Sequence, residues 1–383
     1  MLQYAFNPWR PQKYSKALVL REINGSLGIE EVQLDSLRSN EALVEIHASG
    51  ICHTDLSCMD GTLPAGVPNV FGHEGAGMVL NVGANITDFK TGDKVLLSFN
   101  YCGDCGACKD REVAYCDSFV AQNFGGIRVD GSHTLSTSPD KVKCHANFFG
   151  QSSFMRNAIV NRSTMVKVPK DTNLALFAPL GCGLQTGAGC VLNTLKVGQG
   201  ACIAIFGVGA VGLAAVMAAK MVGAASIIVS DLSESRMALA RELGATHTIA
   251  ATTGNIVEEV RKICPPLGVQ YAIDATGNAK VIANILAMLA PRGKAASVGV
   301  PKVGTSAAVD IFDLLVLGKQ YIGCCEGSSD PQQFLPFLIQ AYKEGKFPVE
   351  KLVKYYPYTD FQEAIVAMKS AAVIKPVLIW SSG

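Results

Sequence analysis

The sequence predicts an α/β protein that joins a doubly wound parallel sheet to a second, irregular β-rich domain. From about residue 184 onward, short apolar strand patterns alternate with helix patterns, as expected of repeated βα units. A glycine turn follows the first of these strands. Before residue 184, short apolar runs are separated by Gly, Pro and Asn and show little helical periodicity. We therefore divide the chain into residues 1–183, 184–326 and 327–383, the last returning to the first domain.

The composition excludes several classes of protein. The chain has 383 residues, 49% of them hydrophobic, which suits two or three domains with large cores and argues against a small binding module. Its formal net charge is +1 and it has no block of Lys and Arg, so the sequence implies no nucleic acid and no membrane as a partner. We expect a small-molecule partner.

The N-terminal stretch argues against export. Residues 7–11, Asn-Pro-Trp-Arg-Pro, interrupt any apolar run of the kind that a secretory signal needs. No apolar run free of glycine breaks is long enough to span a bilayer. We therefore expect a cytoplasmic protein, in which 13 cysteines, an odd number, favour metal binding over a disulfide framework.

The first half predicts strands and one lobe built of loops. Residues 16–23 and 42–48 cluster or alternate Val, Leu and Ile and are expected to be strands. Residues 67–92 hold Gly, Pro and Asn between short apolar runs, a pattern typical of a compact irregular barrel. Residues 99–138 carry few periodic apolar positions, so a long loop-built lobe is expected there. Such a lobe needs an external staple.

Four cysteines in that lobe predict a structural zinc site. They stand within fifteen residues, and four soft donors on a loop suit a closed tetrahedral site: Cys102, Cys105, Cys108 and Cys116. An iron–sulfur cluster is the weaker interpretation, because Cys116 is not followed by Pro and there is no second cluster. Unliganded buried thiols would leave a polar, glycine-rich loop with little to order it.

Three dispersed residues suggest a second metal site of another kind. Cys52, His73 and Cys182 would supply two thiolates and one imidazole, leaving an open position for an alcohol or carbonyl oxygen. Spacing alone does not join them. Taken singly, Cys182 is more readily explained as a small core residue and His73 as a hydrogen-bonded core histidine.

The glycine turn begins the parallel sheet. Residues 201–206 form a short apolar run, then come Gly207-Val-Gly-Ala-Val-Gly212 and a helix over residues 211–222. This order of strand, glycines and helix is the dinucleotide-binding fingerprint of a Rossmann domain. Gly207 permits the tight turn, Gly209 lets the backbone approach a pyrophosphate, and Gly212 allows close packing of helix on strand. Amides of the first helical turn then face the phosphates.

A carboxylate follows at the spacing expected for the adenosine ribose. The strand at residues 226–231 ends in Asp231, about twenty residues past the glycines. Asp231 favours NAD over NADP, because a carboxylate would repel a 2′-phosphate. The alternative is that Asp231 caps the helix that begins near Ser233. Arg236 lies close enough to touch the same ribose and keeps NADP open.

The remaining elements complete the alternation. We expect helices at residues 236–244, 256–263, 281–289, 332–345 and 361–370, and strands at residues 269–273, 295–300 and 376–380.

These motifs together resemble the medium-chain, zinc-dependent alcohol dehydrogenases, over nearly the whole chain beyond the first fifteen residues. Residues 72–77 (Gly-His-Glu-Gly-Ala-Gly), the cysteine lobe, residues 179–183 (Pro-Leu-Gly-Cys-Gly) and the glycine turn stand where that family carries them. Within the family, residues 148–154 and 180–189 are most similar to the aryl (benzyl) alcohol dehydrogenases. The resemblance implies a GroES-like catalytic domain beside the Rossmann domain, two zinc ions per chain and an NAD cofactor.

The resemblance also implies roles for single residues. Cys52, His73 and Cys182 would be catalytic zinc ligands, with Glu74 as a transient ligand. Asp55 would accept a hydrogen bond from His73 and so fix its tautomer.

Other residues would face cofactor and substrate. Thr54 would hydrogen-bond the substrate oxygen and begin the proton relay. His53 and Lys375 match positions that contact the pyrophosphate. The remaining cofactor-binding residues are Gly207, Gly209, Val211, Gly212, Asp231 and Arg236.

An apolar slot would favour an aromatic or allylic alcohol. The expected substrate and nicotinamide walls are Leu63, Phe99, Phe148, Phe149 and Val298, each equally well explained as ordinary core.

The chain departs from its relatives at one position. Many of them end the proton relay in a histidine five residues after the first zinc cysteine, where this chain has Ser57. A serine does not hold a proton near pH 7. Either Thr54 and the ribose hydroxyl pass the proton to water, or His53 takes part, or the enzyme runs mainly as a reductase.

The sequence is compatible with three functions. The first is an NAD-dependent zinc enzyme that transfers hydride between the cofactor and a primary aryl or allylic alcohol or aldehyde. The second is a dedicated biosynthetic reductase of a carbonyl or enone that uses NADPH or NADH. The third is a non-catalytic dinucleotide-binding scaffold, against which the intact zinc-ligand residues count. Relatives form homodimers or homotetramers, and residues 320–325 are a plausible edge strand for pairing subunits.

Overall fold

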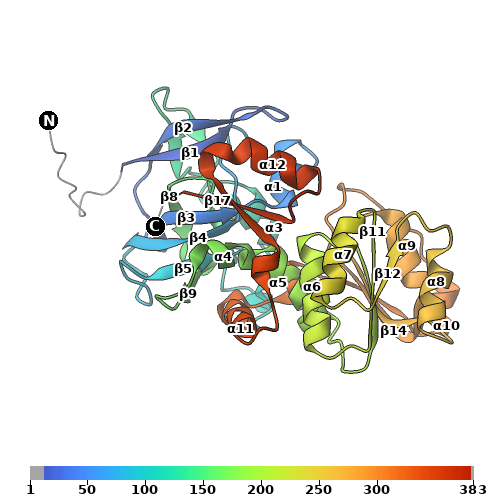
Figure 1. The fold of residues 1–383 in the computed structure, drawn as a ribbon. Coiled ribbons are helices and arrows are strands. Elements are labelled where there is room, and N and C mark those ends of the chain that lie inside the picture. The colour runs from blue at the N-terminus through green and yellow to red at the C-terminus, as the bar shows by residue number, and fades with distance from the viewer. Residues whose placement is uncertain (1–12, 381–383) are drawn as a thin grey trace.

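The computed structural model describes residues 13–380 and contains a parallel sheet on one side and β-rich sheets on the other (Figure 1). The six-stranded parallel sheet has the order β12-β11-β10-β13-β14-β15, so the chain enters at its centre and winds outward to both sides. Its strands are β10 (Cys202–Phe206), β11 (Ser226–Asp231), β12 (His247–Ala250), β13 (Val269–Asp274), β14 (Leu289–Ser297) and β15 (Gln320–Gly323). The connecting helices are α6 (Ala210–Met221), α7 (Glu234–Leu243), α8 (Ile256–Ile263), α9 (Ala279–Ala287) and α10 (Ile311–Val316).

Alternate residues of β10 explain why helices cover both faces of this sheet. Ile203 and Ile205 belong to one core, together with apolar residues of α6 and α7. Ala204 and Phe206 belong to another, together with residues of α8 and α9. Successive side chains of a strand point to opposite faces, so a run that is apolar throughout is buried on both. The doubly wound prediction is confirmed.

The rest of the described chain is β-rich and irregular, as predicted. A seven-stranded sheet has the order β16-β17-β3-β4-β5-β9 with β8 paired to β3, and a four-stranded sheet has the order β1-β2-β6-β7. The first sheet contains β3 (Glu41–Gly50), β4 (Glu74–Val82), β5 (Lys94–Leu97), β8 (Asn157–Asn161), β9 (Met165–Val168), β16 (Val353–Pro357) and β17 (Lys375–Ile379). The second contains β1 (Tyr14–Leu20), β2 (Leu27–Leu34), β6 (Leu135–Thr137) and β7 (Lys143–Cys144).

The C-terminal part comes back to the first sheet. After α11 (Pro331–Lys343) and α12 (Phe361–Lys369), strand β17 pairs antiparallel with β3, with Val377 opposite Gly50. Figure 1 shows this red segment beside the blue strands of the first domain. The three domain limits given above stay predictions.

Short helices connect the strands of the β-rich part. They include α1 (His53–Met59), α2 (Gly106–Lys109), α3 (Phe119–Phe124), α4 (Leu174–Phe177), α5 (Gly183–Gly189) and η5 (Cys190–Thr194). Single turns are η1 (Val113–Tyr115), η2 (Phe148–Gly150), η3 (Arg162–Thr164), η4 (Ala178–Gly181), η6 (Glu326–Ser328), η7 (Val349–Lys351) and η8 (Tyr358–Asp360). Residues 99–138 thus hold only short helices and one short strand between loops.

Some boundaries differ from the predicted ones for local reasons. The first strand ends at Leu20 because a turn with Asn24 at φ 64° follows. The helix expected at residues 281–289 begins at Ala279, since the Asn278 side chain caps it. The strand expected at residues 295–300 begins at Leu289, because the bulged pairing of β14 with β13 extends back past its polar first half.

Within residues 13–380, no single helix is both long and apolar enough to cross a membrane. One pair of helical segments, Leu174–Gly181 and Gly183–Thr194, reaches that length and apolarity only when the two are counted together across a 59° bend.

Candidate active site

Three chain segments bring two thiols and one imidazole together. Cys52 stands between β3 and α1, His73 just before β4, and Cys182 between η4 and α5. One ligand atom from each lies within 4.8 Å of the other two, and all three residues are buried. The structure therefore assembles residues that spacing in the sequence could not join.

Asp55 orients the histidine of this trio. Its Oδ1 accepts hydrogen bonds from His73 Nδ1 at 2.9 Å and from the Gly72 amide at 3.0 Å, and its Oδ2 accepts one from the Cys52 amide at 2.9 Å. With Nδ1 engaged, His73 Nε2 is left buried without a hydrogen-bond partner in the described part of the chain. A buried imidazole nitrogen with no partner, beside two thiols, fits a tetrahedral zinc site with one open position.

The electrostatics of the trio favour a cation. A hydrogen bond from Cys182 lowers the pKa of Cys52 well below its ordinary value, and the same bond together with burial raises the pKa of Cys182. Burial alone would lower the pKa of His73, but Asp55 and the Cys52 sulfur raise it well above normal. The Cys52 thiolate and the Asp55 carboxylate thus place negative charge next to His73.

Glu74 and Lys375 form a buried ion pair at the edge of the trio. Glu74 Oε1 lies 2.8 Å from Lys375 Nζ, which also donates to the Ile51 carbonyl at 3.0 Å. Burial raises the pKa of Glu74 to about 7 against the opposing effect of Lys375. Within residues 13–380, Glu74 Oε2 has no hydrogen-bond partner. It would lie 2.0 Å from a Cβ on Gly50, so this position of the side chain requires glycine at residue 50. The phosphate contact expected of Lys375 stays a prediction.

Sequence reasoning missed the polar groups that surround the trio. Glu326 Oε1 lies 3.7 Å from Cys182 Sγ, although Glu326 is 144 residues away in the chain. Burial raises the pKa of Glu326 to about 7. Gln151 Nε2 donates to the His73 carbonyl at 3.0 Å and to the Ser98 carbonyl at 2.8 Å. Neither Glu326 nor Gln151 belongs to a motif that predicts such a role.

The residues expected in the proton relay lie along α1. Thr54 is half-buried, with its Oγ1 3.8 Å from Cys52 Sγ, while His53 is exposed. Ser57 is buried, and its carbonyl accepts a hydrogen bond from the Leu63 amide.

Aromatic rings form a wall against the trio. Phe149 stacks on His73 with a centroid distance of 4.5 Å, and Phe148 meets His73 edge-on at 5.4 Å. Phe149 adopts a left-handed backbone, with φ 51°, that turns its ring onto the histidine. Two rings that the sequence analysis did not single out, Phe119 and Phe124, pack against Phe149.

The remaining residues expected in the substrate and nicotinamide walls are Phe99, Leu63 and Val298. Phe99 packs against Phe119 with a centroid distance of 5.8 Å. Leu63 is buried in the same core, and Val298 is half-buried at the end of β14.

The glycine turn between β10 and α6 is tightly packed at Gly207 and Gly212 and open at Gly209. A Cβ on Gly212 would lie 1.9 Å from the Gly207 carbonyl oxygen, so only glycine fits there. Gly207 has φ 84°, which other residues rarely adopt. By contrast, a Cβ on Gly209, at the start of α6, would meet no atom of another part of the described chain within 4 Å. The chain leaves space at that point for a phosphate at the helix N-terminus.

Asp231 ends the neighbouring strand beside this turn. Its Oδ2 accepts a hydrogen bond from the Val208 amide at 2.7 Å and its Oδ1 accepts one from the Ser233 amide at 2.9 Å. The cap of α7 is Ser233, whose hydroxyl accepts from the Arg236 amide. Asp231 therefore organises the loop ahead of the helix. In the first turn of that helix, Arg236 Nε is buried without a hydrogen-bond partner among residues 13–380.

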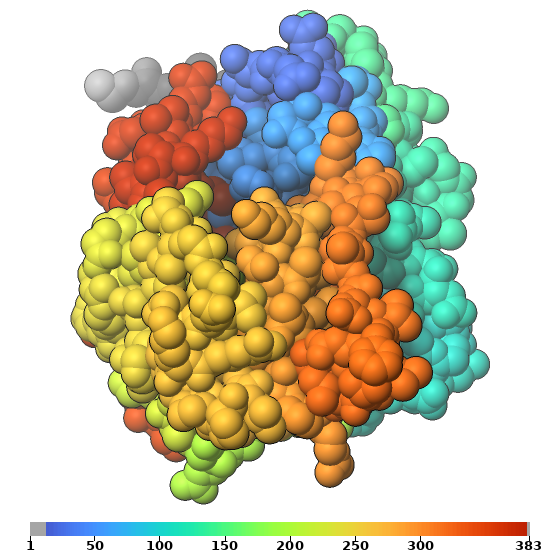
Figure 2. Space-filling model, turned by 90° about the vertical axis from the view of Figure 1, so that its right-hand side faces the viewer, coloured from blue at the N-terminus to red at the C-terminus, as the bar shows by residue number. Residues whose placement is uncertain are grey.

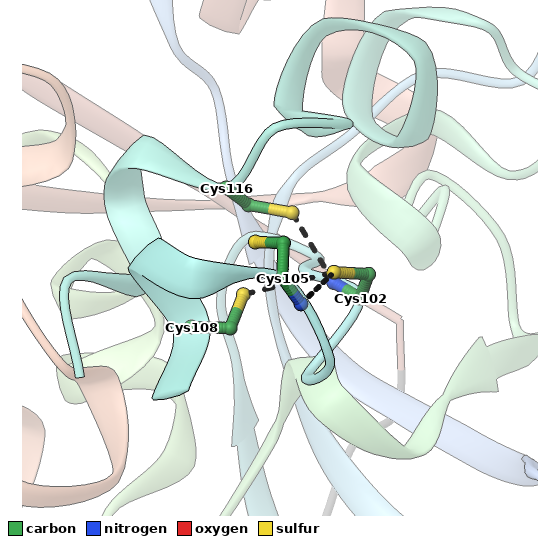
Figure 3. Close-up of side chains that lie close together, drawn as sticks. All are labelled: Cys102, Cys105, Cys108 and Cys116. Carbon is green, nitrogen blue, oxygen red and sulfur yellow. Dashed lines mark hydrogen bonds between the residues drawn. The ribbon is translucent and has the colours of Figure 1, made fainter. Parts of the chain in front are cut away.

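The four cysteines of the lobe converge on one point (Figure 3). Their sulfur atoms lie within 4.8 Å of one another. The amides of Asp104 and Cys105 each donate to Cys102 Sγ at 3.4 Å and lower the pKa of Cys102 to about 7. The Cys102 amide donates to Cys116 Sγ at 3.4 Å. Backbone donors aimed at sulfur stabilise thiolates, so the cluster fits a zinc ion with four cysteine ligands.

The lobe also contacts the parallel sheet. The Tyr115 hydroxyl lies 2.7 Å from Ser328 Oγ and 3.2 Å from the Gly323 carbonyl, both next to the end of β15. Figure 2 shows the lobe (teal) beside the orange surface of the parallel-sheet half.

Comparisons with known proteins match this architecture. A family model described as "Alcohol dehydrogenase GroES-like domain" matches residues 38–170, and one described as "Zinc-binding dehydrogenase" matches residues 210–340. A geraniol dehydrogenase of Castellaniella defragrans is 40% identical over 368 residues, covering 96% of this chain and 98% of that protein.

Two solved structures are similar over the same span. Benzyl alcohol dehydrogenase of Acinetobacter calcoaceticus superimposes with a TM-score of 0.92 and 39% identity, covering 96% of this chain and 99% of the other. An alcohol dehydrogenase zinc-binding domain protein of Burkholderia ambifaria has a TM-score of 0.93 and 42% identity, covering 96% and 98%.

Proposed function

Because the chain belongs to the zinc-dependent medium-chain alcohol dehydrogenase family, we propose that it transfers a hydride between NAD and a primary allylic or aryl alcohol or aldehyde. The observation that carries this proposal is the trio Cys52, His73 and Cys182 with the Phe149 ring stacked on its histidine. A flat, unsaturated substrate would find an aromatic wall beside the metal ligands. The names of two similar proteins, a geraniol and a benzyl alcohol dehydrogenase, support the same substrate class.

The trio would hold a catalytic zinc ion and the lobe cysteines a structural one. A zinc ion at the trio supplies a Lewis acid for the alcohol or carbonyl oxygen. Two other residues would support the site. Asp55 keeps the His73 tautomer in place, and Lys375 balances the charge of Glu74.

Proton movement would begin at Thr54. Its hydroxyl lies beside the Cys52 sulfur, where it can accept the alcohol proton by hydrogen bonding. Ser57 is buried and lacks the basicity to hold the proton, whereas His53, one residue from Thr54, is exposed to water. We therefore assign His53 as the group through which the proton reaches solvent.

The cofactor would lie across the glycine turn. Gly209 leaves space for the pyrophosphate, and the Asp231 carboxylate at the next strand end favours the unphosphorylated ribose of NAD. Arg236 Nε, buried without a hydrogen-bond partner among residues 13–380, would contact the adenosine.

The protein would act as a homodimer in the cytoplasm. Strand β15 is an edge strand, and α10 before it exposes Ile311, Phe312 and Leu315, each by more than three-fifths. An exposed apolar helix beside a free strand edge favours pairing of two copies through their sheets. All 13 cysteines are free, which suits a reducing compartment.

The proposal is tested with purified, zinc-replete protein, geraniol or benzyl alcohol, and either NAD⁺ or NADP⁺, following reduced cofactor by absorbance. We expect turnover of both alcohols and a kcat/KM for NAD⁺ at least about tenfold above that for NADP⁺, because Asp231 repels a 2′-phosphate. No turnover in either direction with protein that holds two zinc ions per chain would contradict the substrate class.

A further inference from the structure

The turn after β15 has an unusual backbone. Glu326, Gly327 and Ser328 have φ values of 46°, 70° and 47°, so three successive residues lie in the left-handed region. Two of them are not glycine, and such residues persist there only where the surroundings hold them. Strained backbone of this kind is concentrated at functional sites.

The surroundings that hold this turn belong to α5 and η5. A Cβ on Gly189 would lie 2.3 Å from the Gly327 carbonyl oxygen, and the same oxygen accepts a hydrogen bond from Asn193 Nδ2 at 3.1 Å. The Ser328 hydroxyl lies 2.7 Å from that of Thr194. The turn is therefore locked against the helix that begins right after Cys182.

The left-handed turn places the Glu326 carboxylate beside Cys182. Glu326 Oε1 lies 3.7 Å from Cys182 Sγ. Its Oε2 lies 3.3 Å from Gln185 Nε2 and 3.4 Å from Thr186 Oγ1. Among residues 13–380, Lys375 pairs with Glu74, and no lysine or arginine pairs with Glu326.

We propose that Glu326 is a positioning residue that holds Cys182 Sγ in place for the catalytic zinc ion. This inference rests on the proposed function, because it concerns the same trio. Glu326 is not itself part of the group of ligand atoms that lie within 4.8 Å of one another, so it acts through Cys182. The polar contacts of its Oε2 fix the carboxylate, and the carboxylate in turn limits the rotamers of the Cys182 side chain.

The chain offers a second metal site that serves as an internal control. Glu326→Ala should lower the affinity of the trio for zinc or cobalt by about 10- to 100-fold, as is usual when a group next to a metal ligand is removed. The four-cysteine site should keep its metal. Affinity is measured by competition with a chelator, counting both sites.

Replacing zinc by cobalt gives a thiolate-to-cobalt absorption band, which a loss of overall stability alone would not shift. In Glu326→Gln the side chain keeps its shape, so we expect a smaller loss of affinity and a shifted thiolate-to-cobalt absorption band from the trio. Glu344→Gln is the matched control, because Glu344 is an exposed carboxylate whose side chain contacts Gln340 and Lys346 and not Cys182. It should leave both affinity and band at parental values.

The outcomes separate this inference from the function it rests on. A Glu326→Ala protein with parental affinity at the trio and an unchanged cobalt band would overturn the inference. A parental protein that binds metal only at the four cysteines would contradict the proposed function itself, whatever Glu326 does. If Glu326→Ala does not fold, an unchanged affinity and band in Glu326→Gln still overturn the inference.

Discussion

At the scale of single residues, the site depends on how each metal-ligand side chain is held by its neighbours. Asp55 accepts hydrogen bonds from His73 Nδ1 and from the backbone amides of Gly72 and Cys52. One carboxylate therefore fixes the histidine ring and the backbone of two chain segments. Three donors on one carboxylate leave no place for an amide nitrogen.

Asp55→Asn should therefore lower kcat/KM by about 10- to 100-fold. The substituted amide brings a second donor against either the Cys52 amide or His73 Nδ1, which disturbs the ring that presents Nε2. Steady-state kinetics and zinc content are measured together. Asp60→Asn is the control, since Asp60 is an exposed acid at the end of the same helix and bonds only Thr62 in its side-chain contacts. Activity within about twofold of the parent in Asp55→Asn would contradict this role.

Glu326 could not be predicted from the sequence, because its position depends on tertiary packing. Cys52, His73 and Cys182 sit in recognisable motifs, and the structure brings them together. Glu326 stands in Cys-Cys-Glu-Gly-Ser with no periodicity or spacing, and only the left-handed backbone of its turn aims it at Cys182. A conformation that depends on packing against α5 leaves no local signal.

At the scale of elements, the glycine turn between β10 and α6 offers a matched pair of substitutions. Gly212→Ala places a Cβ 1.9 Å from the Gly207 carbonyl and should lower the melting temperature as well as cofactor binding. Gly209→Ala meets no atom within 4 Å and has an ordinary φ of −73°, so the melting temperature should stay at the parental value.

Cofactor binding separates the two effects. If the space at Gly209 is for a pyrophosphate, Gly209→Ala should raise the Kd for NADH by about tenfold or more, measured by fluorescence titration. Unchanged NADH affinity in this variant would show that the phosphates lie elsewhere.

Elements with an apolar period were predicted almost to the residue, and those set by tertiary contacts were not. Strand β11 and helix α8 have the predicted limits, because each is a continuous apolar or amphipathic run. Strand β14 starts six residues earlier than predicted, at a stretch that includes Pro291 and Arg292. The pairing of Leu289 with Val269 of β13, and not its composition, extends the strand back over that stretch.

At the scale of the whole molecule, the doubly wound sheet and the β-rich half could both be predicted from the change of pattern near residue 184. The order of strands in the β-rich half could not, because β17 pairs with β3 across more than three hundred residues. Such non-local pairing has no signature in a short window of sequence.

The assembly prediction also belongs to this scale. Replacing Phe312 and Leu315 of α10 together by Glu should convert the proposed homodimer to a monomer, since both are more than seven-tenths exposed and apolar. Light scattering after size exclusion gives the mass. Val366→Glu, an apolar and exposed position on α12, is the control and should leave the mass unchanged. A parental protein that is already monomeric at micromolar concentration would rule the homodimer out.

The ion pair of Glu74 with Lys375 has a consequence for how the protein is made. The two residues are 301 positions apart, so a ribosome adding roughly 5–20 residues per second leaves Glu74 without its cation for tens of seconds. During that interval the chain also lacks β17, the strand that pairs with β3 just ahead of Cys52. Nascent chains would therefore be open to oxidants and stray metals for that time, so overproduction should give more fully loaded protein when zinc is ample in the growth medium.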